Sequence, residues 1–97
     1  GNGGYDAFMS AVKKILKKHH LQCPQLLDYQ IRIPRGGQTD ALTESIITWE
    51  MNGKRVQTVG IDPDQVMAAV NATLKMLNLH LMQLDQINDK NLVETAA

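Results

Sequence analysis

Hydrophobic residues recur at helical spacing near the start of the chain, between Asp6 and His20. The residues on this apolar side are Phe8, Val12, Ile15, Leu16 and His19. Lysines occupy the opposite side and the end of the segment, where positive charge suits the C-terminal end of a helix dipole. Asp6 suits the positive N-terminal end for the same reason. We therefore predict a first helix over Asp6–His20.

A period of two replaces the helical period in the middle of the chain. Leu26–Ile33 is predicted to be a strand, and the β-branched and aromatic residues of Ala41–Met51 predict a second. Asn52-Gly53 follows, and this pair favours a type I′ hairpin turn because both positions need positive φ. Arg55–Ile61 is then a third strand, paired antiparallel with the second.

A second helix is predicted after Asp62, which can cap it, with Pro63 in the first helical position and Gln65 completing a capping box. Its apolar stripe consists of Val66, Val70, Leu74, Leu77, Leu81 and Leu84. Residues 85–97 are polar and without pattern, so we expect a frayed tail. The predicted fold is α+β, a helix, three antiparallel strands and a helix, with both helices on one face of the sheet.

Length and charge exclude several classes of function. A chain of 97 residues is too short for a (β/α)8 barrel, which needs about 250 residues. Ten basic and ten acidic residues cancel, so neither nucleic acid nor a membrane surface is expected as a partner. The lone Cys23 fits a reducing, cytoplasmic location. The abrupt opening on Gly1-Asn2-Gly3-Gly4 suggests a segment of a longer protein.

Candidate chemical groups are few, and each has a structural explanation. His19 and His20 can bind a metal, but no nearby cysteine, aspartate or glutamate completes a ligand set, so we favour a helix-end pair that interacts with the helix dipole. Cys23 has no base at a recognisable spacing. Asp62 and Asp64 resemble a carboxylate pair, yet helix capping accounts for both. The residues alone indicate a small domain that binds a ligand or oligomerises, without a visible active site.

Three segments in a characteristic order resemble the regulatory domain of the 2-isopropylmalate synthase and citramalate synthase family. Gly1–Ala7 is similar to that domain's glycine-rich turn, which opens a helix. Leu26–Tyr29, followed by Gly37 and Asp40-Ala41, is similar to the next strand and its loop. Val59–Pro63 and the alanine-rich helix after it are similar to the last strand and helix. The resemblance extends from Gly1 to about Leu79.

The resemblance implies a fold, a partner and a role. The family's regulatory domain consists of two βββα units, pairs with the same domain of a second subunit, and binds a feedback amino acid near the interface. Residues 1–84 would then form a partial regulatory domain that holds the last helix of the first unit and all of the second. The parent would be a cytoplasmic, homodimeric acyltransferase that condenses acetyl-CoA with 2-oxoisovalerate in an N-terminal barrel. A divalent metal is expected in that barrel, and no cofactor is expected on this segment.

The resemblance also implies an effector site and no catalytic or metal-binding residues on this chain. Carried over by position, the effector-binding residues are Asn2, Tyr5, Asp6, Leu26, Tyr29, Ile33, Ala41, Ile61, Asp62 and Pro63. The apolar members can contact the aliphatic side chain of a bound amino acid. Backbone N–H groups at helix starts can bind its carboxylate, and Asp6 or Asp62 can bind its ammonium group. Without the resemblance, the apolar members would be interpreted as ordinary core.

The resemblance is compatible with more than one effector. Leucine is the first expectation, isoleucine follows if the parent is a citramalate synthase, and a dimerisation module without an effector is a third hypothesis. The family usually has proline where Gly4 stands and an aliphatic residue where Tyr5 stands, so the pocket is expected to be reshaped.

Overall fold

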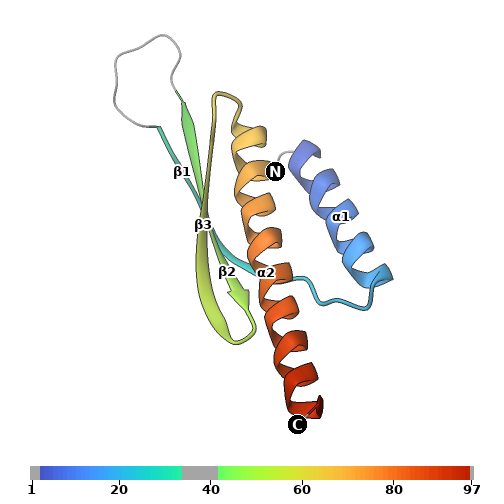
Figure 1. The fold of residues 1–97 in the computed structure, drawn as a ribbon. Coiled ribbons are helices and arrows are strands. Elements are labelled where there is room, and N and C mark those ends of the chain that lie inside the picture. Colours follow the sequence, from blue (N-terminus) through green and yellow to red (C-terminus); the bar gives the residue numbers. More distant parts are fainter. Residues whose placement is uncertain (1–2, 34–41, 97) are drawn as a thin grey trace.

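The computed structural model describes residues 3–33 and 42–96, with side chains in the last helix described as far as Leu84. The elements in order are α1 (Gly3–Lys18), β1 (Gln25–Arg32), β2 (Thr43–Met51), β3 (Lys54–Asp62) and α2 (Gln65–Ala96). The three strands form one antiparallel sheet in the order β1-β2-β3 (Figure 1). The predicted α+β fold is confirmed.

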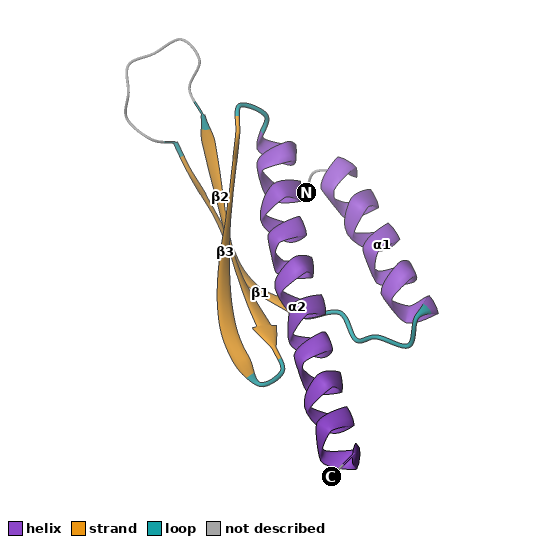
Figure 2. Cartoon of the chain, in the orientation of Figure 1, coloured by secondary structure: helices purple, strands orange, loops and turns teal. Residues whose placement is uncertain are grey.

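Both helices lie on the same side of the sheet, but only one packs on it directly (Figure 2). α2 runs along β2 and β3, whereas α1 packs on the flank of α2. α1 reaches the sheet through Tyr5, whose ring centre lies 6.0 Å from that of Tyr29 on β1. The prediction that both helices lie on one side of the sheet is confirmed, although α1 packs mainly on α2 and not on the sheet itself. On the side of the sheet that faces the helices, β1 is therefore the least covered strand.

The core lies between β2 and α2. Ile47, Trp49 and Met51 share one face of β2, as the period of two requires, and pack against α2 at Ala72 and Met76. The indole Nε1 of Trp49 donates a 2.9 Å hydrogen bond to the Thr58 hydroxyl on β3. Since both side chains are buried, this bond satisfies a donor that would be costly to leave unpaired.

Gly60 lets β3 approach α2 closely. A Cβ added at Gly60 would collide with the carbonyl oxygen of Ala68 and the amide nitrogen of Ala72. Ala68 and Ala72 are themselves fully buried, so small residues on both sides bring the two backbones together. The sequence pattern alone identified an alanine-rich helix but not this contact.

α1 begins and ends differently from the prediction. It starts at Gly3, so two glycines lie inside its first turn, although glycine is a poor helix former. At the other end, the Leu21 amide donates to the Leu16 carbonyl at 2.8 Å and the His20 amide to the Lys17 carbonyl at 3.0 Å. His20 has φ 59°, which makes this a Schellman cap with histidine in the left-handed position that glycine usually occupies.

α2 also begins and ends later than predicted. Asp64 is its N-cap, since its carboxylate accepts a 2.8 Å hydrogen bond from the amide of Val66. Asp62 instead accepts from the amide of Asp64 at 2.9 Å and closes the turn before the helix. The assignment of the cap to Asp62 and of the first helical position to Pro63 was therefore wrong. The helix continues to Ala96 rather than ending near Leu84, and fraying of its last turns stays a prediction.

The hairpin between β2 and β3 is confirmed. Asn52 has φ 51° and Gly53 has φ 80°, the two positive values that a type I′ turn requires. β2 and β3 then pair in register from Met51 opposite Lys54 to Thr43 opposite Asp62.

Candidate functional site

The exposed helix side of β1 forms one wall of a cavity. Register places Leu26 opposite Trp49, Tyr29 opposite Ile47 and Ile31 opposite Ser45, so these β1 residues share the face that α2 covers elsewhere. α2 lies over β2 and β3 instead, and this leaves Leu26 38% and Ile31 44% exposed. Apolar side chains on this face thus border open space.

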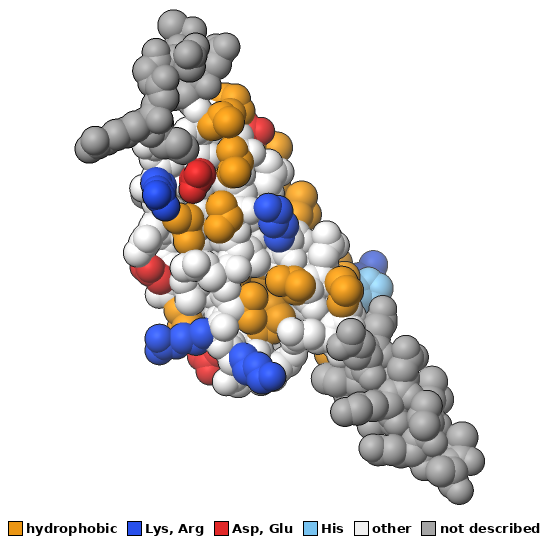
Figure 3. Space-filling view, turned by 60° about the vertical axis from the view of Figure 1, so that its left-hand side comes forward, with side chains coloured by type: hydrophobic (Ala, Val, Ile, Leu, Met, Phe, Trp, Pro, Cys, Tyr) orange, Lys and Arg blue, Asp and Glu red, His pale blue; other side chains and the backbone are white. Residues whose placement is uncertain are grey.

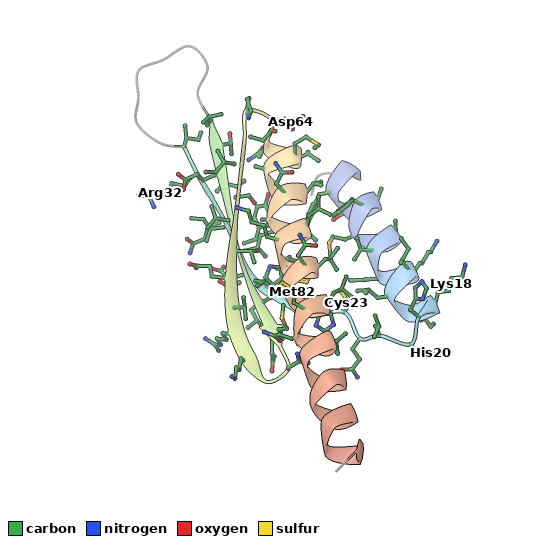
Figure 4. All side chains as sticks on the ribbon, viewed as in Figure 1. Lys18, His20, Cys23, Arg32, Asp64 and Met82 are labelled. Carbon is green, nitrogen blue, oxygen red and sulfur yellow. The ribbon has the colours of Figure 1, made fainter. Side chains whose placement is uncertain are left out.

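The cavity has a volume of about 380 Å³ and is shared by three elements. Its lining residues are Tyr5 and Asp6 of α1, Leu26, Tyr29 and Ile31 of β1, and Gln65 and Val66 of α2. The volume lies within the range of small-molecule sites, and the mixture of apolar walls with a few polar groups is typical of them. Figure 4 labels Asp64 just before α2, whose first two residues, Gln65 and Val66, line the cavity.

Tyr5 fixes the geometry of the cavity. Its hydroxyl lies 2.8 Å from the hydroxyl oxygen of Thr73, and Thr73 donates its own hydrogen to the Ala69 carbonyl at 2.8 Å. Tyr5 is therefore the donor in the first of these bonds. Its ring also contacts Tyr29 and Phe8, with centres 6.0 and 6.3 Å away. One side chain thus holds α1 against both α2 and β1.

Burial makes the Tyr5 hydroxyl harder to ionise. Desolvation raises the pKa of Tyr5 above its ordinary value, although its hydrogen bond with Thr73 acts in the opposite direction. The charge available at the cavity is that of Asp6, an exposed carboxylate in the first turn of α1. Gln65 adds an amide that can donate and accept. The site can therefore bind a small molecule with an apolar part and a cationic group.

The part of the chain that the structure describes offers little for other chemistry. It contains no group of three or more histidine, cysteine or acidic residues that could hold a metal ion. His80 is buried and its Nε2 lies 3.0 Å from the Gln22 carbonyl, where it joins α2 to the loop after α1. Cys23 is half-buried, and burial raises the pKa of its thiol, which lowers its reactivity. On the face shown in Figure 3, acidic, basic and apolar side chains are interspersed.

Four of the sequence-predicted effector residues meet at the cavity: Tyr5, Asp6, Leu26 and Tyr29. Ile61 does not, because it lies on the sheet face away from the helices and is 49% exposed. Asp62 ends β3 and Pro63 lies in the turn before α2, and neither lines the cavity. The exposed Ile33, after β1, does not line it either. Asn2 and Ala41 lie outside the described residues. Whether any of these residues binds an effector stays a prediction.

Three lining residues were not predicted. Ile31 shares a strand face with Tyr29, so alternation along β1 could have identified it. Gln65 and Val66 belong to the first turn of α2, and their position depends on where that helix begins. The sequence prediction began the helix two residues too early and therefore pointed to the turn instead.

Comparison with known proteins decides the family. The family model of the LeuA allosteric (dimerisation) domain matches residues 1–81. The chain belongs to this family. The LeuA domain is also similar to part of 2-isopropylmalate synthase of Aquifex aeolicus (strain VF5), with 33% identity over 87 residues, or 90% of the chain. It is 32% identical over 96 residues, or 98% of the chain, to 2-isopropylmalate synthase of Pseudoalteromonas atlantica (strain T6c / ATCC BAA-1087).

The chain spans a small part of these relatives, 16% of the first and 17% of the second. The match of the family model confirms the resemblance inferred from the sequence motifs. Within the described residues, no helix has both the length and the apolar character needed to cross a membrane.

Proposed function

We propose that this LeuA domain is the amino-acid-sensing part of a homodimeric 2-isopropylmalate synthase and binds leucine in the cavity between α1, β1 and the start of α2. The observation that carries the proposal is that cavity, in a family whose model is described as allosteric and dimerising. The relatives bear the name 2-isopropylmalate synthase, which supports leucine ahead of isoleucine as the effector.

The cavity suits both ends of an amino acid. Leu26, Ile31 and Val66 supply apolar surface for an aliphatic side chain. The Asp6 carboxylate can pair with the ammonium group, and a charge-assisted hydrogen bond of this kind is stronger than a neutral one. The carboxylate end of the ligand would lie toward the side-chain amide of Gln65, which can donate a hydrogen bond to it.

The same cavity can transmit binding. A ligand there contacts three elements at once, so it stabilises the arrangement in which they are closest. Allosteric coupling amounts to about 1–3 kcal/mol of difference in affinity between two such arrangements. The condensation of acetyl-CoA with 2-oxoisovalerate, and any divalent metal it uses, would belong to the barrel of the parent enzyme. The role of this chain is then to bind the end product and to bias the pairing of subunits.

A variant of Asp6 tests the site. Asp6→Asn keeps the volume of the side chain and removes its charge, so leucine should bind about tenfold to a hundredfold more weakly in calorimetric titration. Glu50→Gln is the matched control, because it removes one exposed negative charge on the sheet face away from the helices and the cavity. Its affinity for leucine should equal that of the wild type. Equal affinity in the Asp6→Asn variant would place the ammonium elsewhere and contradict this arrangement.

A further inference from the structure

The two edges of the sheet differ in their protection. On β3, Lys75 of α2 donates a 2.7 Å hydrogen bond to the Val59 carbonyl, and the Asn71 amide reaches the Ile61 carbonyl at 3.5 Å. β1 forms the other edge, and within the described residues no side chain donates to one of its carbonyls. Seven of its eight residues are exposed. An uncovered strand edge is a template for pairing with another strand.

The charges on β1 are arranged so that the strand complements itself. Asp28, Gln30 and Arg32 lie opposite Thr48, Ile46 and Glu44, on the sheet face away from the helices. Asp28 and Arg32 carry opposite charges at equal distances along the strand from Gln30. Charges on an edge strand commonly discourage pairing, and they do so directly where like charges would lie opposite each other. Here an antiparallel copy brings opposite charges together instead.

We propose that two copies of this chain pair through β1, antiparallel and centred on Gln30, to form a continuous six-stranded sheet. In this register Asp28 lies opposite the partner's Arg32 on the face away from the helices. Tyr29 lies opposite the partner's Ile31 on the helix face. Opposite charges and aromatic–β-branched pairs are both favourable cross-strand neighbours. This inference rests on the homodimer of the proposed function and gives it an interface.

The register follows from symmetry and from the shape of the strand. Directly opposed residues of antiparallel strands have side chains on the same face of the sheet. A two-fold axis perpendicular to the sheet must therefore lie midway between one residue and the same residue of the second copy. Centring on Tyr29 would oppose Asp28 to Gln30, and centring on Ile31 would oppose Gln30 to Arg32. A bulge between Leu26 and Asp28 interrupts the alternation, so regular pairing is confined to residues 28–32. Only the register centred on Gln30 pairs both charges.

Arg32 is well placed for this contact. Its side chain points away from the helices at the end of β1 (Figure 4). It also lies across from Glu44 on β2, and a guanidinium group has enough donors for two carboxylates. On the helix face, the partner's Ile31 would lie next to Tyr29, which lines the cavity. Leucine binding and strand pairing would therefore be linked, since each completes the surroundings of the other.

Disulfide trapping tests the axis of the pairing. Gln30→Cys, made in a Cys23→Ser background, faces its own copy at the two-fold axis. Opposed Cα atoms of antiparallel strands are about 4.5–5.5 Å apart, within the range of a disulfide. Mild oxidation should give a covalent dimer. The matched control is Gln57→Cys in the same background, an exposed position on β3 that should stay monomeric in denaturing gels.

Charge exchange tests the register. Asp28→Arg and Arg32→Asp should each weaken dimerisation by about tenfold in sedimentation equilibrium, because two attractive pairs become two repulsive ones. The double variant should return to within about threefold of the wild type. Circular dichroism checks that each variant folds, which is expected since the changed side chains are exposed.

The outcomes separate this inference from the function it rests on. A wild-type dimer that tolerates both single exchanges, or that cross-links equally at positions 30 and 57, pairs through another surface and overturns the β1 interface alone. A wild-type chain that stays monomeric at high micromolar concentration, with and without leucine, contradicts the homodimer itself. Rescue in the double variant together with cross-linking at position 30 supports the proposed sheet.

Discussion

Tyr5 joins α1, α2 and β1 through a single side chain, so it offers a sharp test at the scale of one residue. Tyr5→Phe keeps the ring contacts and removes the hydrogen bond to Thr73. The free energy of unfolding should fall by about 0.5–1.5 kcal/mol at pH 7, measured by denaturant titration. Tyr29→Phe is the control and should cost less, because no hydrogen bond of the Tyr29 hydroxyl is seen among the described residues.

The deficit of the Tyr5→Phe variant should depend on pH. Because burial raises the pKa of Tyr5, the unfolded state loses this proton first, near the ordinary tyrosine value of about 10. The contribution of the hydroxyl to stability is thus complete below pH 10 and declines as the pH rises above it. The difference between wild type and Tyr5→Phe should shrink over that range. A difference that grows above pH 10 would contradict the buried, neutral hydroxyl.

Gly60 is the second residue whose role follows from geometry alone. Gly60→Ala should lower the free energy of unfolding by about 1–3 kcal/mol, since its Cβ meets backbone atoms of α2 that cannot rotate away. Gly3→Ala is the matched substitution in open space, where a Cβ meets nothing within 4 Å. It should stabilise the chain by up to about 1 kcal/mol, because alanine favours the helix. Thermal unfolding that shows equal effects would refute the close contact.

At the scale of elements, α1 carries strain at its end. The backbone of His20 adopts the left-handed conformation. For a residue with a Cβ, this conformation costs about 1–2 kcal/mol of stability. His20→Gly should raise the free energy of unfolding by about 0.5–1 kcal/mol, because the relief exceeds the entropic cost of glycine. His19→Gly serves as the control and should not stabilise. If His20→Gly destabilises the chain, the imidazole makes a contact that outweighs the strain.

Patterns along the sequence predicted the elements well and their ends poorly. The period of two and the Asn52-Gly53 turn were sufficient for the sheet, because each depends on neighbouring residues only. The ends of the helices depend on which of several similar residues caps them, and Asp64 rather than Asp62 does so for α2. The contact of Gly60 with Ala68 depends on tertiary packing. No local pattern encodes such a contact.

The candidate site was predictable where a family motif and a strand face coincide. Tyr29 and Leu26 were named from the motif. Strict alternation would place them on opposite faces, and the bulge between Leu26 and Asp28 brings both to the helix side. Gln65 and Val66 enter the cavity because α2 crosses over β2 and β3 and leaves β1 open. That crossing depends on the small residues packed under the helix. The motif gave no information on it.

At the scale of the whole molecule, the extent of the domain is a prediction that can be measured. The described buried side chains of α2 end at His80, so a chain truncated after Leu84 should keep its cooperative unfolding. Its free energy of unfolding should fall by less than about 1 kcal/mol, because fraying ends contribute little. Loss of the cooperative transition would show that residues 85–97 belong to the folded unit.

The sensing role of the domain depends on whether the cavity binds a branched-chain amino acid. Calorimetric titration of the chain with L-leucine should show saturable binding, with isoleucine and valine weaker and D-leucine weaker still, because ammonium and side chain must reach Asp6 and the apolar wall together. Isoleucine binding more tightly than leucine would support the citramalate synthase alternative. An absence of binding by all four, to protein that is folded and dimeric, would leave a dimerisation module and contradict the sensing role.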